Sequence, residues 1–369
     1  MGHQENGASR TGRGVVAEAR GGPFTTEELR VRDPGPGEVL VRIAASGVCH
    51  SDMHYVDGHL GDEFPYLLGH EGSGYVEEVG DGVDPSRVGE FVVLTYRAPC
   101  HACRSCLAGR IEHCRQPVEA VTRPETRDGR SLTPALSLGT FSEYLVVAAP
   151  QAVTVSPDCP PEQASLLGCA VSTGVGSVLR TAAVEPGATV AVFGAGGVGI
   201  NVIQGARLAR AGRIVAVDLV SRKLDWATSF GATDVVDASR TDPVEEVRAL
   251  TGGHGVDYSF DAVGFATTTR QCVEVLDYRG TAVLIGFPPD DQVLTLPMQG
   301  FFFPGTTLKV SLNGDSLASR DFPQLIRWYL EGKLDLDGLV TERIGLDDVE
   351  SAFNAIHRGD TIRSVISVS

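Results

Sequence analysis

Residues 188–218 read ATVAVFGAGGVGINVIQGARLARAGRIVAVD, with a glycine-rich turn between two apolar runs. The first run, Thr189–Phe193, is rich in β-formers, helix-like spacing continues from the turn to Ala211, and the second run ends at Asp218. Strand, turn, helix and strand in this order predict one βαβ unit of a parallel sheet. A G-x-G-x-x-G turn between strand and helix, with an acidic residue closing the second strand, predicts a site for a dinucleotide.

The glycines of this turn have separate physical roles in dinucleotide binding. Gly194 permits the tight turn, Gly196 leaves room for a pyrophosphate, and Gly199 lets the helix pack closely on the strand. The phosphates then meet the free N–H groups at the positive end of the helix. A βαβ unit without a ligand would explain the apolar strands, but it gives no reason for the glycines.

Asp218 determines which dinucleotide is expected. Its carboxylate would accept hydrogen bonds from the adenosine ribose and repel a 2′-phosphate, so it favours NAD over NADP. Arg222 and Lys223 follow closely and leave NADP as the alternative.

Composition restricts the class of protein. A chain of 369 residues with 42% apolar residues, 44 glycines and a mean hydropathy of +0.02 is typical of a soluble α/β protein with two domains. The net charge of −16 argues against nucleic acid or an anionic membrane as a partner. The N-terminus has no apolar export signal, so we expect a cytoplasmic protein whose eight cysteines are reduced.

Changes in pattern along the chain predict the domains. Residues 1–13 are expected to be a flexible extension, and residues 14–168 form a β-rich domain with many glycine and proline turns. Residues 169–312 alternate strands with helices, which predicts a doubly wound parallel sheet. Residues 313–369 offer two amphipathic helices and a last strand, and we expect them to complete the first domain.

Four closely spaced cysteines form the second strong motif. They follow the spacing C-x2-C-x2-C-x7-C and are Cys100, Cys103, Cys106 and Cys114. Turns of this spacing let four thiolates converge on one tetrahedral Zn²⁺, and such a site has no open position. The alternative, a redox C-x-x-C pair, would require a thioredoxin-like setting that the flanking loop does not supply.

Further metal-ligating residue types are scattered along the chain. They lie in GVCHSDMH, LLGHEG and LLGC, and are Cys49, His50, His54, His70, Glu71 and Cys169. Two thiolates and one imidazole would leave a fourth zinc position for water or substrate, as in a catalytic site. Taken singly, each residue is compatible with a packed core cysteine or a loop histidine. Together with a dinucleotide turn, they predict an active site.

The sequence resembles the medium-chain, zinc-dependent alcohol dehydrogenases from Gly14 to Val368. The motifs occur in the order of that family: GVCHSDMH, GHEGSG, the four-cysteine loop, LLGCAVSTGVGSVL, GAGGVG with Asp218, and the terminal IRSVI. The resemblance implies an α/β protein with a GroES-like β-rich catalytic domain and a Rossmann domain. It also implies two Zn²⁺ per chain and NAD as cofactors, and a homodimer or homotetramer.

The resemblance assigns roles to individual residues. Cys49, His70 and Cys169 would bind the catalytic zinc, Glu71 would lie behind it as an alternate ligand, and the four clustered cysteines would bind the structural zinc. The implied cofactor contacts are His50, Thr173, Gly194, Gly196, Gly197, Val198, Gly199, Asp218, Lys223, Ile285 and Arg363. The implied lining of the substrate pocket is Tyr96, Phe287 and Leu312.

The resemblance also implies a mechanism. Zinc would lower the pKa of a bound hydroxyl, so that a zinc-bound alkoxide could transfer hydride to the nicotinamide. Ser51 would accept the proton and pass it through the cofactor ribose to His54 near the surface. The expected function is therefore an NAD-dependent zinc oxidoreductase acting on a primary alcohol or its aldehyde.

Two alternatives concern the substrate and the chemistry. The segments YRAPCHACRSC, LTPALSLGTFSEY and RDFPQLIRWYLEGKLDLDGLV resemble the branch that oxidises S-(hydroxymethyl)mycothiol or S-(hydroxymethyl)glutathione. The loop Arg115–Arg130, which would border the substrate site, departs from the pattern of that branch. A catalytically inactive nucleotide-binding relative is the other alternative, and the complete set of expected ligands argues against it.

Overall fold

The computed structural model describes residues 9–368, which form two compact units. The first unit comprises the described residues up to Cys169, the segment Leu317–Gly332, and the described residues from Leu336 onward. The second unit comprises Ala170–Ser316 and Lys333–Asp335. The chain therefore leaves the first unit, builds the second, and returns.

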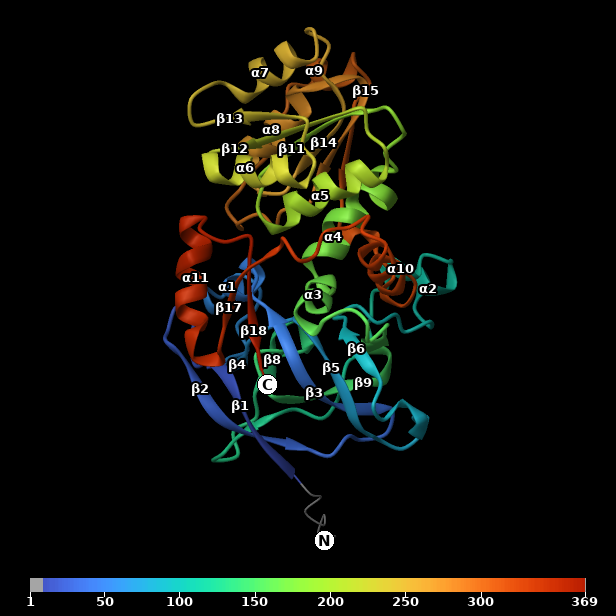
Figure 1. Ribbon diagram of the computed structural model, residues 1–369, viewed down its shortest axis with the longest axis vertical. Helices are drawn as coiled ribbons and strands as arrows, with labels where there is room; N and C mark the ends of the chain where they lie inside the picture. The colour runs from blue at the N-terminus through green and yellow to red at the C-terminus, as the bar shows by residue number, and fades with distance from the viewer. Residues whose placement is uncertain (1–8, 369) are drawn as a thin grey trace. The chain divides into compact units, whose positions relative to one another are not determined.

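The first unit is built on two sheets (Figure 1). One has the strand order β7-β2-β1-β4-β8, and the other has β10-β6-β5-β3-β18-β17 with β9 also paired to β3. The strands are β1 Ser9–Ala17, β2 Phe24–Arg32, β3 Glu38–Gly47, β4 Tyr66–Leu67, β5 Glu71–Val79, β6 Phe91–Leu94, β7 Glu125–Thr126, β8 Thr133–Pro134, β9 Tyr144–Ala148, β10 Ala152–Thr154, β17 Val340–Ile344 and β18 Arg363–Ser367. Buried valine, leucine and isoleucine side chains from β3, β5, β6 and β9 form one core between these strands.

The helices of the first unit are short, apart from the two near the C-terminus. They are α1 His50–Val56, α2 Arg104–Leu107, α3 Pro161–Ser165, α10 Ala318–Leu330 and α11 Val349–Arg358. The two amphipathic helices predicted for this region are present. The first begins at Ala318 and continues through Pro323, because burial of Phe322, Leu325 and Ile326 holds the helix.

The prediction of a flexible extension over residues 1–13 is wrong for its described part. Ser9–Arg13 belongs to β1, which pairs antiparallel with β2 from Ser9 opposite Arg32 onward. The alternating exposure of these residues explains why the sequence lacks an obvious apolar strand there. Residues 1–8 lie outside the described part of the chain.

The second unit contains a parallel six-stranded sheet of order β13-β12-β11-β14-β15-β16 (Figure 1). Its strands are β11 Thr189–Phe193, β12 Arg213–Asp218, β13 Asp234–Asp237, β14 Val256–Asp261, β15 Leu276–Leu284 and β16 Thr307–Val310. The two strands predicted on either side of the glycine turn are present as β11 and β12, and β16 forms one edge of the sheet. The strand order reverses between β11 and β14, which is where a doubly wound sheet opens a crevice for a ligand.

Helices cover both faces of this sheet. They are α4 Ala170–Gly176, α5 Gly197–Leu208, α6 Ser221–Phe230, α7 Pro243–Leu250, α8 Ala266–Glu274 and α9 Met298–Phe302. Helices α7 and α8 bury Val247, Cys272 and Val273 against β11, β12 and β13, whereas α5 packs on α4 and α6. Helix α5 ends at Leu208, somewhat before the predicted Ala211. Within the described residues, no helix has both the length and the apolar character needed to cross a membrane, and the expected cytoplasmic location stays a prediction.

A left-handed segment at residues 313–315 shifts the domain boundary from its predicted place. Asn313, Gly314 and Asp315 have φ values of 52°, 67° and 47°. The Asn313 side chain accepts hydrogen bonds from Ser172 and Thr173 of α4, so this segment belongs to the second unit rather than the first. Asn and Asp tolerate this conformation better than other residues with a Cβ.

Candidate functional site

The four clustered cysteines converge in the first unit as the spacing predicts. The Sγ atoms of Cys103 and Cys106 are 3.6 Å apart, those of Cys103 and Cys114 are 3.9 Å apart, and those of Cys114 and Cys100 are 3.5 Å apart. A tetrahedral zinc with Zn–S bonds of about 2.3 Å requires sulfur atoms about 3.8 Å from one another. The four thiols therefore fit one zinc with all its positions filled.

The local backbone favours thiolates in this cluster. N–H groups of the surrounding turns, first that of Arg115, lower the pKa of Cys103 to about 6. Amides of Ala102 and Cys103 likewise lower the pKa of Cys100, at 3.5 Å and 3.3 Å from its Sγ. Burial raises the pKa of Cys106 to about 12, as expected for a thiol among thiolates without a cation. A bound cation would remove that penalty.

A second cluster brings together side chains that are far apart in the sequence. One ligand atom of each residue lies within 4.8 Å of the others, and the residues are Cys49, His70, Glu71 and Cys169. Cys49 directly precedes α1, His70 and Glu71 lie at the start of β5, and Cys169 directly precedes α4. His70 and Glu71 are fully buried, and Cys49 and Cys169 are 5% and 9% exposed.

Asp52 aligns two members of this cluster. Its Oδ2 accepts a hydrogen bond from the backbone N–H of Cys49 at 3.0 Å, and its Oδ1 lies 2.8 Å from Nδ1 of His70. Both side chains of the Asp52–His70 pair are fully buried. Although burial opposes a charged imidazole, Asp52 raises the pKa of His70 well above its usual value. The pair fixes the ring so that Nε2 remains available to a ligand.

The environment of Nε2 of His70 shows whether the cluster fits a metal ion. This atom is buried and has no hydrogen-bond partner within residues 9–368. A buried polar nitrogen without a partner costs free energy, and a cation at this point would satisfy it. Two thiols, one imidazole and one carboxylate are also the donor types that zinc prefers. The cluster therefore fits a zinc ion.

A buried arginine, Arg363, opposes the negative charge around this cluster. A hydrogen bond from Cys169 lowers the pKa of Cys49 well below its usual value, and the same contact raises the pKa of Cys169. Burial raises the pKa of Glu71 to about 7, while the guanidinium of Arg363, 3.8 Å away, opposes that rise. Arg363 thus stabilises negative charge beside the thiols.

The residues expected in the proton path lie on α1, next to Cys49. Ser51 Oγ is 3.9 Å from Cys49 Sγ, and His54 is one helical turn further along. Burial lowers the pKa of His54, so its ring is neutral at lower pH than an ordinary histidine. His50 is the exposed first residue of the helix. The ring of Tyr96 meets that of His70 edge-on, with centroids 6.3 Å apart, and burial raises its pKa.

The glycine turn has the close backbone approaches that the sequence predicts. Gly194 has φ +90°, and a Cβ on Gly199 would lie 1.7 Å from the carbonyl oxygen of Gly194. A Cβ on Gly196 would meet nothing within 4 Å, so this residue leaves space in front of the helix. Asp218 accepts hydrogen bonds from the N–H of Ala195 at 2.8 Å and from that of Val220 at 2.9 Å. Its carboxylate is therefore fixed against the turn.

The remaining predicted residues of the second unit lie at three places. Gly197 and Val198 open α5, and Lys223 lies in the first turn of α6. The backbone N–H of Ile285 donates to the carbonyl of Asp261 after β15, and Phe287 follows it and is 46% exposed. Leu312 is 54% exposed before the left-handed segment, whereas Thr173 is buried in α4.

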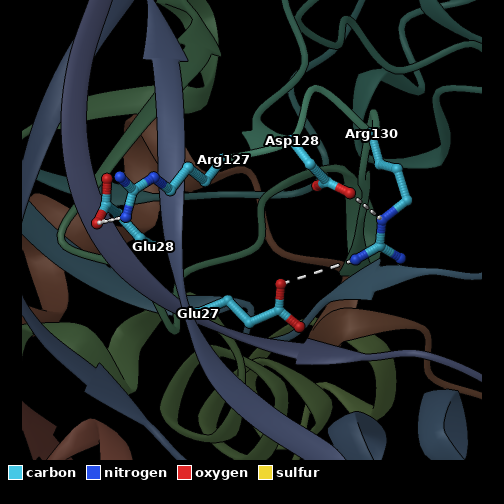
Figure 2. Close-up of a pocket in the computed structure, with 5 residues that line it drawn as sticks. All are labelled: Glu27, Glu28, Arg127, Asp128 and Arg130. Carbon is cyan, nitrogen blue, oxygen red and sulfur yellow. Dashed lines mark ion pairs between the residues drawn. The ribbon is translucent and has the colours of Figure 1, made fainter.

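A charged surface pocket of about 610 Å³ lies elsewhere in the first unit, and Figure 2 shows its five lining residues, Glu27, Glu28, Arg127, Asp128 and Arg130. Arg127 lies 3.6 Å from Glu28, and Arg130 lies 3.7 Å from both Glu27 and Asp128. These contacts attach the end of the Arg115–Arg130 loop to β2. The pocket contains none of the predicted site residues, and its opposite charges are already paired.

Family models and relatives cover both units. The model of the alcohol dehydrogenase GroES-like domain matches residues 35–158, and that of the zinc-binding dehydrogenase matches residues 197–331. S-(hydroxymethyl)glutathione dehydrogenase of Escherichia coli O157:H7 is 37% identical over 366 residues, covering 96% of this chain and 99% of that protein. The chain belongs to the medium-chain, zinc-dependent alcohol dehydrogenase family. The predicted α/β fold, the enzyme class, and zinc and a nicotinamide dinucleotide as cofactors are confirmed.

Solved structures agree with this membership. An alcohol dehydrogenase zinc-binding domain protein from Burkholderia ambifaria has a TM-score of 0.93 and 33% identity, covering 98% of this chain and 100% of that one. Benzyl alcohol dehydrogenase from Acinetobacter calcoaceticus has a TM-score of 0.91 and 28% identity, with the same coverage.

Asp52 is the site residue that the sequence reasoning missed. The signal available was its position three residues after Cys49, where an acidic side chain can bind the backbone at the start of a helix. That signal indicates a helix start rather than a contact with a histidine 18 residues away in the sequence.

Proposed function

We propose that this enzyme transfers hydride between a primary alcohol, or its aldehyde, and NAD, at the Cys49–His70–Cys169 cluster. The observation that carries the proposal is the buried Nε2 of His70, which lacks a partner among the described residues and faces two thiols. The named relatives support the class of substrate, since S-(hydroxymethyl)glutathione and benzyl alcohol both carry a –CH₂OH group.

Cys49, His70 and Cys169 would hold the zinc, and Glu71 would lie behind it as an alternate ligand. When bound, zinc supplies Lewis-acid chemistry that lowers the pKa of an alcohol hydroxyl. Ser51, whose Oγ lies 3.9 Å from Sγ of Cys49, would accept the hydroxyl proton as it gives up its own hydroxyl proton. His54, one helical turn away, would receive the proton that Ser51 gives up, and burial lowers the pKa of His54, which favours the ring form that can accept it. Arg363 and His50 would bind the pyrophosphate, and Thr173 would contact the nicotinamide.

NAD is the proposed dinucleotide because of Asp218. Its carboxylate, fixed by two backbone N–H groups, places negative charge where a 2′-phosphate would lie. Asp218→Ser should raise the ratio of NADP to NAD efficiency. If the wild-type enzyme already prefers NADP, its preference must come from Arg222 or Lys223 instead of Asp218.

A second candidate substrate is an S-(hydroxymethyl) adduct of a low-molecular-weight thiol. It is favoured by the 37% identity to S-(hydroxymethyl)glutathione dehydrogenase over nearly the whole of both chains. The deciding experiment measures NAD reduction with a panel of primary alcohols, and with formaldehyde plus glutathione or mycothiol. Preference for a free alcohol supports the first candidate, preference for an adduct supports the second, and no turnover of either contradicts both.

Ser51→Ala tests the proton path directly. We expect a severe loss of kcat with zinc content and NAD affinity nearly unchanged, because the hydroxyl acts on the proton and not on either ligand. If Ser51 only packs the loop, the variant should instead lose zinc or melt earlier. An active Ser51→Ala enzyme with full zinc would exclude this path.

We also propose a homodimer or homotetramer. The edge strand β16 leaves one side of the sheet open, and nearby apolar side chains are strongly exposed: Val293, Met298, Phe302, Phe303 and Val310. An open edge with apolar neighbours is a surface that soluble proteins normally cover. Sedimentation should show that the wild type is an oligomer. It should also show that Val310→Lys, which places a charge on this edge, is dissociated. A monomeric wild type would contradict the proposal.

A further inference from the structure

Asp261, the last residue of β14, is a fully buried carboxylate with four short hydrogen bonds. Its Oδ1 accepts from the backbone N–H of Val263 at 2.9 Å, the N–H of Gly264 at 3.0 Å and the hydroxyl of Thr268 at 3.0 Å. Its Oδ2 accepts from the hydroxyl of Thr269 at 2.6 Å. This one side chain therefore fixes the turn after β14 and joins it to α8.

The position of this turn connects it to the dinucleotide crevice. β11 and β14 are neighbours in the sheet, and the strand order reverses between them. Ligands of doubly wound sheets bind beyond the carboxyl ends of the strands at such a point. Gly194 follows the carboxyl end of β11, and Asp261 is at the carboxyl end of β14, paired with Phe193.

The turn also touches the glycine loop and the strand on its other side. A Cβ on Gly194 would lie 2.7 Å from Cγ2 of Val263, and a Cβ on Gly286 would lie 2.4 Å from the N of Gly264. The turn therefore lies directly against Gly194 and Gly286. Val263 is nevertheless 37% exposed and Phe265 is 48% exposed, so the fixed turn presents apolar side chains at the surface.

We propose that Asp261 is a positioning residue for the dinucleotide: its carboxylate holds Ala262–Gly264 beside Gly194 as one wall of the crevice. This inference rests on the dinucleotide site of the proposed function and adds a residue to it. The competing explanation is that Asp261 only joins β14 to α8. The two explanations differ in what the loss of the carboxylate does to cofactor affinity at a given loss of stability.

Asp261→Asn is the test variant, because it keeps the size of the side chain but removes the negative charge that strengthens the three hydrogen bonds from Val263, Gly264 and Thr268. The NH₂ group that replaces Oδ2 cannot accept from Thr269, whose hydroxyl can donate to the carbonyl of Phe265 at 3.1 Å instead. We expect the Kd for NADH, followed by fluorescence titration, to rise about tenfold. At saturating NAD, kcat should stay within about twofold, since the turn is not a reacting group.

Ser259→Ala is the matched control for stability. Ser259 is buried on the same strand and donates to the carbonyl of Cys272 at 2.6 Å, on the side of α8. Asp257→Asn is the control for charge, because Asp257 binds the N–H of Thr189 near the amino end of β14. Both controls should leave the Kd for NADH unchanged, and Ser259→Ala should lower the melting temperature.

The inference is overturned if Asp261→Asn melts at a lower temperature but binds NADH like the wild type. It is also overturned if Ser259→Ala raises the Kd for NADH as much as Asp261→Asn does. Thr268→Val serves if Asp261→Asn does not fold, because it removes one donor and keeps the carboxylate. A twofold to threefold rise in Kd is then expected, and no change contradicts the inference. NADH binding is measured without alcohol, so failure of the substrate proposal leaves this test intact.

Discussion

The two cysteine-containing clusters of the first unit differ in their ligand sets and in their surroundings. The four-thiol cluster comes from one short segment and includes two partly exposed residues, Cys100 and Cys103. The mixed cluster comes from the starts of α1, β5 and α4, and it is buried. The first would fill every position of a zinc ion with thiolates. The second has a buried arginine, a carboxylate with a pKa of about 7, and an imidazole nitrogen that has no hydrogen-bond partner within residues 9–368.

The difference indicates which cluster supports the fold and which supports chemistry. Four thiolates fill a tetrahedral zinc and leave no position for a substrate. Two thiolates and one imidazole leave a position open, and Glu71 with Arg363 supplies adjustable charge beside it. We therefore expect damage to the first cluster to appear in stability, and damage to the second to appear in turnover.

Cys49→Ser should have the largest effect. Removing one thiolate of the mixed cluster should lower kcat/KM by roughly 10³-fold or more, since the Lewis acid contributes several kcal/mol. Metal analysis should find the four-thiol zinc retained, and the melting temperature should change little. A variant that keeps near-normal turnover would remove the distinction between the clusters.

Cys103→Ser should show the opposite behaviour. We expect the melting temperature to fall by about 5–10 °C, because binding of a structural zinc is itself folding free energy. Activity per correctly folded molecule should remain close to normal. Circular dichroism and active-site titration of the same sample separate the two quantities, and a stable but inactive enzyme would contradict the assignment.

Asp52→Asn should weaken the mixed cluster without removing a ligand. Asp52 orients His70 from behind, and partners of this kind change metal affinity or activity by about 10–100-fold. Competition with a zinc chelator should release one zinc earlier than in the wild type. Asp128→Asn, an exposed carboxylate in the pocket of Figure 2, is the matched control and should have no effect on zinc release.

His54→Gln should have the smallest effect, about tenfold in kcat, which is below the usual general-base contribution of about 10²–10⁴ because water can partly replace the ring. Burial lowers the pKa of His54. The wild-type ring is therefore unprotonated, and able to accept a proton, down to a lower pH than an ordinary histidine. The loss in the variant should shrink as pH rises, because hydroxide can then take the proton. Profiles of kcat from pH 6 to 10 measure this trend, and a constant loss would indicate a packing role.

Local sequence was enough for the first cluster and for the βαβ unit. The spacing from Cys100 to Cys114 and the run Ala188–Asp218 each contain their whole structure within one short segment. The mixed cluster could be assembled only through family resemblance, since nothing local connects Cys49 to Cys169. Pairing between distant segments is a tertiary property that no single window contains.

Buried acids were the main residues that sequence analysis could not identify. Asp52 and Asp261 look like surface aspartates in a chain with many acidic residues, and only packing shows that both are fully buried and hydrogen-bonded. The edge strand β16 was missed because its alternating run TLKV is only 4 residues long and mostly exposed. The shift of Asn313–Asp315 into the second unit likewise depends on contacts with α4.

The left-handed segment limits which amino-acid substitutions this protein can accept during evolution. A Cβ on Gly314 would lie 2.3 Å from the carbonyl oxygen of Ser172, and a Cβ on Gly176 would lie 2.3 Å from that of Gly314. Both obstacles are backbone atoms, so no substitution of a neighbouring side chain can create room. Laboratory evolution toward a new alcohol or a new cofactor should therefore keep glycine at both positions, however freely the exposed Leu312 beside them varies.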